Sequence, residues 1–256
     1  MMDVSAYLDR IGYFGPTPPT LATLRAIHRA HMFAVPFEDL DISLGRRIVV
    51  EEEACVHKIV EGRRGGFCYE LNGAFAALLR ALGFRVTLLS AGVARTDGGR
   101  GPEFDHLTLR IDLDQPWLAD VGFGDSFLEP LRLQVDLEQS DPAGRFQLVW
   151  AGDRIELERA QPDGTWKRQY SFTLQPRRIE EFAAMCHYHQ TSPDSHFVQN
   201  RICTLPTREG RITLSGMKLI ETRNGQKMER ILASEDEWNA ELKKRFGIIL
   251  GQHDSA

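Results

Sequence analysis

A long amphipathic helix that starts at a cysteine is the feature that most constrains the fold of this chain. Apolar residues recur at helical spacing after Cys68, and Gly83 follows them as a left-handed C-cap. The apolar positions are Leu71, Ala74, Phe75, Leu78, Leu79 and Leu82. Because such a stripe is stable only when other elements cover it, we expect this helix to pack against a core, with Cys68 at its N-terminus.

The hydrophobic pattern changes from helical to alternating directly after Gly83. Residues 85–95 predict a strand, and residues 106–113 alternate strictly, with His106 on the polar face and Leu107 on the apolar one. Further strand candidates are residues 117–121 and 146–158, and Asp163-Gly164 predicts a hairpin turn between residues 154–160 and 165–174. The middle third of the chain is therefore predicted to be rich in strands.

The first third of the chain is predicted to be helical. Thr20 follows two prolines and would cap a helix that ends at Pro36, and residues 48–61 predict a second, shorter helix. The stripe of the first helix is Leu21, Leu24, Ile27 and His31.

The last third combines strands with one helix. Residues 211–214 and 218–223 predict strands, and the Asn224-Gly225 turn leads to a return strand at residues 227–232. Ser234 with Glu237 predicts the capped start of a helix whose stripe is Trp238, Leu242 and Phe246. Helices, then strands, then a mixture favour an α+β fold over a doubly wound α/β sheet.

The composition argues against several classes of protein. A net charge of -5 is unlike the basic excess of nucleic-acid binders, so no nucleic-acid partner is expected. No apolar run approaches the ~20 residues that span a bilayer, and the N-terminus does not resemble a signal peptide. We therefore expect a cytoplasmic protein with no membrane partner.

The cysteines and histidines predict free thiols rather than disulfides or a metal site. A chain of 256 residues with 4 cysteines lacks a disulfide framework, and thiols stay reduced in the cytoplasm. Cys186, His187, His189 and His196 lie close in sequence, but their spacing matches no standard zinc pattern. No metal site is therefore predicted, and one of the thiols is available as a nucleophile.

The position of Cys68 suits a nucleophile. A helix N-terminus carries unpaired N–H groups and a partial positive charge, both of which favour a thiolate. Gly65 and Gly66, just before it, would allow a tight bend and leave room for a substrate. The competing interpretation of a lone cysteine at this position is a small buried residue.

His106 and Asp120 are the residues that would activate such a thiol. His106 lies on the polar face of its strand, and Asp120 ends an apolar strand just before Gly122, where an unpaired acid is costly. Taken singly, a histidine such as His106 is more often a solvated surface residue, and Asp120 has the alternative of a turn residue. Taken together with Cys68, they form a plausible nucleophile, base and orienting acid.

Several segments closely resemble the arylamine N-acetyltransferase family. They are Arg64-Gly65-Gly66-Phe67-Cys68-Tyr69-Glu70-Leu71-Asn72, Phe104-Asp105-His106-Leu107, Asp120-Val121-Gly122-Phe123-Gly124, Pro36-Phe37-Glu38-Asp39-Leu40 and Thr191-Ser192-Pro193-Asp194-Ser195-His196-Phe197. These landmarks occur in the family's order across most of the chain. Asp39 departs from the asparagine usual in the family, a change that adds charge without touching the triad.

The resemblance implies a fold in three parts around a catalytic core similar to that of cysteine proteases. They are an N-terminal helical bundle with the nucleophile (residues 1–84), a central β-barrel-like domain with the histidine and aspartate (85–190) and a C-terminal α/β lid (191–256). It also implies a structural ion pair between Arg64 and Glu38, the alternative being two solvated side chains.

The resemblance further implies a chemistry and its substrates. Acetyl-coenzyme A would acetylate Cys68, and an arylamine, arylhydrazine or N-hydroxy arylamine would then take the acetyl group, with His106 moving protons and Asp120 orienting it. Backbone N–H groups at the start of the Cys68 helix would help to bind the oxyanion. No permanently bound cofactor is implied, and a monomer or homodimer is expected.

Substrate contacts are predicted at two places. Aromatic residues would line the acceptor pocket, the alternative for each being core packing; they are Phe37, Tyr69, Phe104 and Phe123. In the glycine-rich loop before His106, the backbone of Gly98 and Gly99 and the Arg100 side chain would meet the coenzyme A pyrophosphate. Glycine-rich surface hairpins without any ligand are also common.

Two competing functions use the same residues differently. A thiol hydrolase or amide synthase would need only another acceptor, either water or an amine within a larger molecule. A non-catalytic binding protein would keep the fold without using Cys68 as a nucleophile. An acetyltransferase needs added arylamine to turn over acetyl-coenzyme A, whereas a hydrolase or amide synthase does not. A non-catalytic binding protein is indicated if Cys68 reacts with iodoacetamide no faster than a free thiol.

Overall fold

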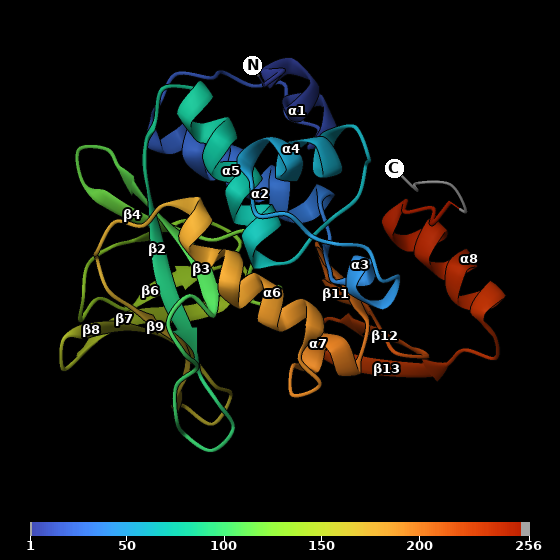
Figure 1. The fold of residues 1–256 in the computed structure, drawn as a ribbon. Coiled ribbons are helices and arrows are strands. Elements are labelled where there is room, and N and C mark those ends of the chain that lie inside the picture. Colours follow the sequence, from blue (N-terminus) through green and yellow to red (C-terminus); the bar gives the residue numbers. More distant parts are fainter. Residues whose placement is uncertain (1, 252–256) are drawn as a thin grey trace.

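A computed structural model describes residues 2–251, and its N-terminal part is helical (Figure 1). Its helices are α1 (Val4–Arg10), α2 (Leu21–Ala34), α3 (Leu40–Ser43), α4 (Glu52–Val60) and α5 (Cys68–Ala81). The predicted nucleophile is the first residue of α5, and Gly83 follows that helix in the left-handed region, with φ of +88°. The predictions for α2 and α5 are confirmed, while α4 starts a few residues later than expected.

An antiparallel sheet of 8 strands follows α5 and curls into a nearly closed barrel. Its strands are β2 (Arg85–Val93), β3 (His106–Asp112), β4 (Pro116–Ala119), β5 (Leu131–Arg132), β6 (Gln139–Asp141), β7 (Gly144–Ala151), β8 (Arg154–Ala160) and β9 (Trp166–Phe172). Their order is β5-β4-β3-β2-β9-β8-β7-β6. The Gln139 side chain on β6 joins the two edges, because it bonds to both the backbone N–H and C=O of Arg132 on β5, at 2.7 and 3.0 Å.

A second antiparallel sheet includes strands from both ends of the chain. It contains β1 (Phe37–Glu38), β10 (Ile202–Thr207), β11 (Gly210–Ser215), β12 (Lys218–Arg223) and β13 (Gln226–Ile231), in that order. Helix α8 (Glu235–Phe246) packs on this sheet through Trp238, Leu242 and Phe246, as its sequence predicts. Because β1 pairs with β10, the N-terminal segment is anchored directly to the C-terminal sheet.

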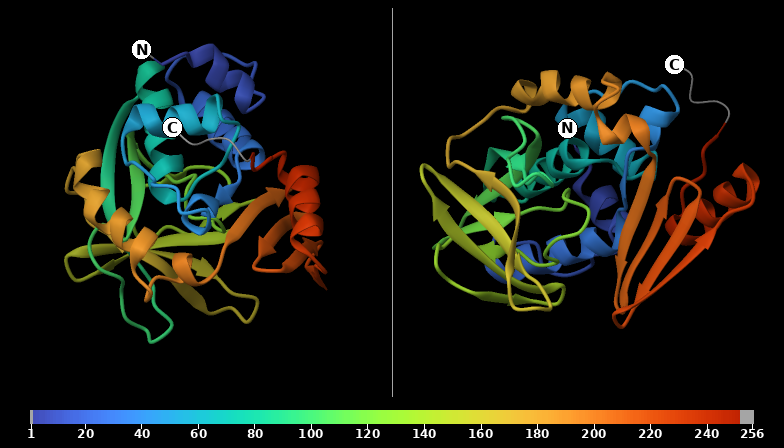
Figure 2. Two further views of the ribbon diagram at one scale, coloured as in Figure 1. Left: turned by 45° about the vertical axis from the view of Figure 1, so that its right-hand side comes forward. Right: turned by 90° about the horizontal axis from the view of Figure 1, so that it is seen from below.

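Three short elements cross from the barrel to the C-terminal sheet. They are the 3-10 helix η1 (Ile179–Phe182), α6 (Ala183–Thr191) and α7 (His196–Gln199). Figure 2, in the view from below, shows the two sheets on either side of α2 and α5, with α6 and α7 along one rim. The α+β class and the sequence of helices, barrel and C-terminal sheet are confirmed, and the division at residues 84 and 190 stays a proposal.

Turn and capping signals account for most correct boundaries. Asn224 and Gly225 both have positive φ, at +50° and +78°, and they join β12 to β13. Ser234 accepts the Glu237 N–H at 3.2 Å, but the Glu237 carboxylate bonds to the N–H of Ala233 rather than of Ser234, so half of the predicted capping box forms.

One strand prediction is wrong. Residues 146–158 do not form a single strand, because Gly152, with φ of +65°, lies in the turn that separates β7 from β8. The apolar alternation of Phe146, Leu148 and Trp150 changes phase before Ile155 and Leu157, and the residues between them include Gly152-Asp153, so the sequence does signal a break that the single-strand prediction overlooked. The hairpin predicted around Asp163-Gly164 is confirmed by the pairing of β8 with β9.

None of the described helices is long and apolar enough to cross a membrane. The core instead centres on α5, which is buried along most of its length. One side of α5 packs against the N-terminal helices, and another covers the leucine face of β3. This packing brings the N-terminus of α5 to the first residue of β3.

Candidate active site

Cys68, His106 and Asp120 meet at the junction of the helical segment and the barrel. Cys68 and His106 line one cavity of about 310 Å³, which also reaches Phe37 on β1 and Phe197 on α7. Asp120 lies behind His106 and follows β4 directly. Antiparallel pairing of β3 with β4 explains this placement, because it sets Ala119 opposite Leu109 and so places Asp120 beside the start of β3.

The imidazole of His106 is held by a short bond to Asp120. Its Nε2 lies 2.6 Å from Oδ2 of Asp120, and both side chains are buried. Burial raises the pKa of Asp120, but the charge and hydrogen bond of His106 and the donors Asn72 and Gly122 outweigh it, so the net pKa lies below its usual value. Asp120 is therefore ionised at neutral pH, and it holds Nε2 of the ring as a donor, which directs Nδ1 to other partners.

The polar face of β3 is buried at the start of the strand, where His106 and Thr108 lie. The His106 ring lies 5.3 Å from that of Phe123 and 5.0 Å from that of Tyr170, centroid to centroid. In a barrel both strand faces are covered, here by α5 on the leucine side and by barrel side chains on the other. The interpretation of His106 as a solvated surface residue is therefore wrong.

The environment of Cys68 does not by itself produce a thiolate. Burial raises the pKa of Cys68 well above its usual range, while the Leu107 backbone amide lowers it in part. Cys68 retains 6% exposure, so it is buried yet reachable from the cavity. The helix N-terminus is therefore insufficient alone, and ionisation depends on charged partners around the cavity.

Asn72 connects the elements that carry the three residues. It lies one turn after Cys68, its Nδ2 donates to the Leu107 C=O at 2.6 Å and to Asp120 Oδ1 at 2.9 Å, and its Oδ1 accepts the Val121 N–H at 2.9 Å. One buried amide thus links α5, β3 and the loop after β4. The sequence signal was its i+4 spacing from Cys68, which places both on one helical face.

Replacing Asn72 with alanine is expected to lower activity on the order of 10²-fold, because the triad elements lose their common link. Each partner left unsatisfied would also cost about 1–3 kcal/mol of stability. Acetyl-transfer rates and thermal melting measure both effects. Asn200→Ala is the matched control, since the exposed Asn200 lines the same cavity but its side chain bonds to the Ser215 hydroxyl, away from the three residues. Equal behaviour of the two variants would contradict this role.

His28 on α2 supports the aspartate from behind. Its Nδ1 lies 2.9 Å from the Leu128 C=O, so Nδ1 carries the proton and Nε2 accepts the Asp120 N–H at 3.2 Å. Burial lowers the pKa of His28 to about 4, and the ring is neutral in the working pH range. No sequence pattern indicated this role, because the residues it joins are 92 and 100 positions away.

The glycines around Cys68 serve packing rather than substrate access. A Cβ on Gly65 would lie 2.0 Å from the Pro36 carbonyl oxygen, and one on Gly66 would lie 2.7 Å from Glu70. A Cβ on Gly122 would lie 2.8 Å from the Cα of Cys68. The expected room for a substrate beside Gly65 and Gly66 is thus filled by protein.

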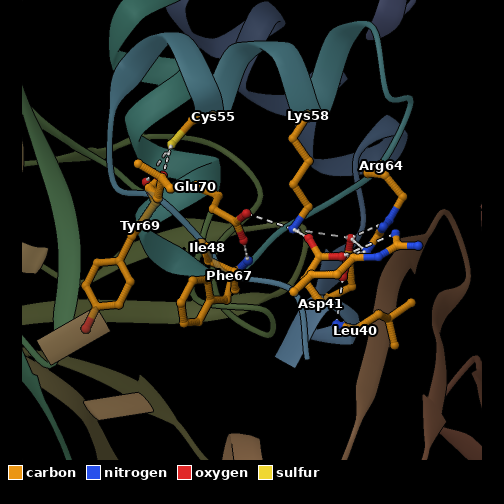
Figure 3. A network of polar contacts seen from close by, with 12 residues as sticks. Leu40, Asp41, Ile48, Cys55, Lys58, Arg64, Phe67, Tyr69 and Glu70 are labelled. Carbon is orange, nitrogen blue, oxygen red and sulfur yellow. Dashed lines mark hydrogen bonds and ion pairs between the residues drawn. The ribbon is translucent and has the colours of Figure 1, made fainter. Parts of the chain in front are cut away.

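A buried chain of alternating charges supports the N-terminus of α5 (Figure 3). Arg64 bonds to Glu38 at 2.8 Å, which confirms the predicted pair, and also contacts Asp41 at 3.1 Å. Lys58 then bridges Asp41 at 2.6 Å and Glu70 at 2.7 Å. Glu70 accepts the Phe67 N–H at 3.1 Å, so the network ends on the residue before the nucleophile. Burial raises the pKa of Glu70 to about 7, against the effect of Lys58.

The four predicted pocket aromatics divide into two pairs. Phe37 and Phe123 line the cavity with Cys68. Tyr69 and Phe104 are not among its lining residues: Tyr69 is fully buried and donates to the Phe104 C=O at 2.8 Å, while Phe104 packs on Phe182. Tyr69 and Phe104 therefore serve core packing, which was the alternative interpretation for each of them.

Asp39, where the family usually has asparagine, lies nearer to the candidate active site than expected. Asp39 lines the same cavity as Cys68, although it forms no bond with the triad, and its Oδ1 accepts the Ile202 N–H at 2.7 Å. Burial raises the pKa of Asp39 to about 7. The charge at this position therefore changes near neutral pH.

The glycine-rich loop lies between β2 and β3 and outside the cavity. The Gly98 N–H donates to the Arg95 C=O at 3.1 Å, and the Gly99 N–H donates to Asp97 at 2.8 Å. These backbone donors are already used within the turn, contrary to the expected pyrophosphate contact. Any coenzyme A contact here rests on the exposed Arg100 guanidinium.

Cys186, His187, His189 and His196 do not all face one site. His189 and His196 line the cavity, whereas His187 borders a different hollow with Arg47, and Cys186 accepts a bond from Gln190 at 3.2 Å. Among residues 2–251, no three histidine, cysteine, aspartate or glutamate side chains come together as a metal site.

The chain is similar to known proteins in both sequence and fold. A profile of the N-acetyltransferase family matches residues 20–255. The chain is 37% identical to an arylamine N-acetyltransferase of Mycolicibacterium smegmatis, over 98% of this chain and 93% of that protein. The arylamine N-acetyltransferase structure from Salmonella typhimurium superposes with a TM-score of 0.92 at 30% identity, over 99% and 93% of the two chains. That of Mycobacterium marinum in complex with CoA gives a TM-score of 0.89 at 33% identity, over 96% and 93%.

Proposed function

The chain belongs to the arylamine N-acetyltransferase family, and on that premise we propose that Cys68, His106 and Asp120 are its nucleophile, base and orienting acid. The enzyme transfers acetyl groups to arylamines, with acetyl-coenzyme A as the donor. The observation that carries the residue assignment is the buried 2.6 Å bond between Asp120 and a histidine that shares one cavity with the thiol.

The first half-reaction acetylates the enzyme. His106 accepts the Cys68 proton through Nδ1, and the thiolate attacks the acetyl carbonyl of the donor. The tetrahedral oxyanion is stabilised by backbone N–H groups at the start of α5. The Phe67 N–H is not one of them, because Glu70 already accepts its bond. The C–S bond to coenzyme A breaks, and the leaving thiolate takes the proton from His106.

The second half-reaction uses the same cavity in reverse. An aromatic amine enters between Phe37 and Phe123, and its nitrogen attacks the acetyl-cysteine carbonyl while His106 takes its proton. The Cys68 thiolate leaves, and the resting pair with His106 is restored. Arylhydrazines and N-hydroxy arylamines present a nucleophile of similar size and are further acceptors. For the donor, the Arg100 guanidinium would contact the pyrophosphate of coenzyme A.

Mass spectrometry of the intact protein tests this scheme. Incubation with acetyl-coenzyme A is expected to add one acetyl group at Cys68, and an added arylamine should remove it with formation of the N-acetyl product. Peptide mapping locates the modified residue. Loss of the acetyl group to water at the same rate without an amine would support the hydrolase alternative, and an acetyl group on another residue would contradict the assignment.

A further inference from the structure

A second histidine–carboxylate pair lies on the wall of the cavity, apart from His106 and Asp120. His189 on α6 places Nε2 at 3.1 Å from Oδ1 of Asp105, the residue that directly precedes His106. Both side chains are largely buried, at 6% and 13% exposure, and both line the cavity with Cys68. The acetyl-transfer scheme leaves this pair without a role.

Both ring nitrogens of His189 face an oxygen atom. The Ser195 hydroxyl donates its one hydrogen to the His189 C=O at 3.1 Å, so its oxygen is the acceptor toward Nδ1, at 3.4 Å. Nε2 faces a carboxylate oxygen, which is also an acceptor. Acceptor oxygens at both ring nitrogens favour the positively charged imidazolium, which donates from both.

Asp105 is fixed in place from several sides. Its Oδ2 accepts the Val93 N–H at 3.0 Å, and the Tyr69 hydroxyl donates to its backbone C=O at 3.2 Å. A Cβ on Gly101 would lie 2.1 Å from that same Oδ2, so the carboxylate has little freedom to turn away. Without a cation beside it, this carboxylate would present a negative charge to the cavity.

The negative charge of Asp105 raises the pKa of the Cys68 thiol. Burial contributes most to the raised pKa of Cys68, and the charges of Asp105 and Asp120 raise it further. His106 compensates Asp120, as their 2.6 Å bond shows, and His189 stands in the same relation to Asp105. The other titratable groups that line the cavity are Asp39 before α3 and His196 on α7, and Cys186 on α6, outside the cavity, also raises the pKa of Cys68.

We propose that His189 is a positioning residue for the nucleophile: its imidazolium neutralises the Asp105 carboxylate on the cavity wall and thereby favours the ionised form of Cys68. The inference rests on the proposed function only in taking Cys68 as the reactive thiol. The helix α6 thus contributes to reactivity through charge, although its histidine does not bond to the reacting atoms.

The pH dependence of Cys68 alkylation by iodoacetamide tests the proposal. His189→Gln keeps a hydrogen-bond donor but removes the positive charge, so the midpoint of the alkylation profile should rise by about half to one pH unit. The double variant His189→Gln/Asp105→Asn removes both charges and should return the midpoint to that of the wild type. A midpoint unmoved in the single variant, or moved and not restored in the double variant, would overturn the proposal.

Two further measurements keep the test decisive. Thermal melting shows whether each variant is folded, and nitrogen NMR of the His189 ring in the wild-type enzyme requires no substitution. Two protonated ring nitrogens are expected at pH 7, and a neutral ring would refute the inference. Failure of the wild type to acquire an acetyl group on Cys68 would instead refute the proposed function, so the two failures are distinguishable.

Discussion

Substitution of Cys68 by serine is expected to abolish acetyl transfer, with a loss on the order of 10⁴- to 10⁶-fold and no loss of folding. A serine hydroxyl is far harder to ionise than a thiol, and neither His106 nor the N-terminus of α5 compensates for that difference. The change removes little volume from a site that borders the cavity, so the melting temperature should stay close to that of the wild type.

The measurement is the arylamine-dependent release of coenzyme A, together with the intact mass after acetyl-coenzyme A alone. Cys186→Ser is the matched control: that thiol is also buried, but it accepts a bond from Gln190 and does not line the cavity. The control should keep activity and acquire the acetyl group. Substantial transfer by the Cys68→Ser protein would show that another residue carries the acetyl group.

Substitution of Arg64 by alanine is expected to cost about 3–5 kcal/mol of stability, the typical effect of removing one partner of a buried ion pair. Glu38 is fully buried, and Arg64 holds it at 2.8 Å. Lys58 lies 3.9 Å from the same carboxylate and also bridges Asp41 and Glu70, so it would compensate the Glu38 charge only in part. Because the network continues through Asp41 and Lys58 to the start of α5, activity should fall as well.

Thermal melting measures the loss, which corresponds to about 2–4 °C for each kcal/mol in a chain of this size. Arg145→Ala is the matched control, because Arg145 pairs with Glu138 at the surface, with exposures of 51% and 47%. An exposed pair of this kind contributes about 0–1 kcal/mol. If the two variants melted alike, the buried pair with Glu38 would have no special structural role.

Sequence alone was sufficient where the signals are local. The stripe after Cys68, the Thr20 cap and the Asn224-Gly225 turn each specify a conformation within a few residues, and each prediction is confirmed. Elements such as β5 and β6 are too short to show any periodicity, because they contain only 2 and 3 residues. Local rules therefore fail where a pairing partner rather than the segment itself sets the structure.

The residues of the site also divide into those that the sequence predicts and those that only the tertiary structure reveals. Residue types and their order, strengthened by the family resemblance, identified Cys68, His106 and Asp120 before any distance was known. Only the tertiary structure decided that Asn72 and His28 hold Asp120 in place, that Lys58 joins the charge network, and that His189 faces Asp105.

The physical reason is the separation of these residues along the chain. His189 and Asp105 are 84 positions apart, and Asn72 and Asp120 are 48 apart, so no local pattern connects them. The packing of α5 on β3, and of α6 along the rim, brings their hydrogen-bonding groups within about 3 Å. The sequence by itself thus predicted which side chain attacks, whereas the tertiary structure decided which charges surround it.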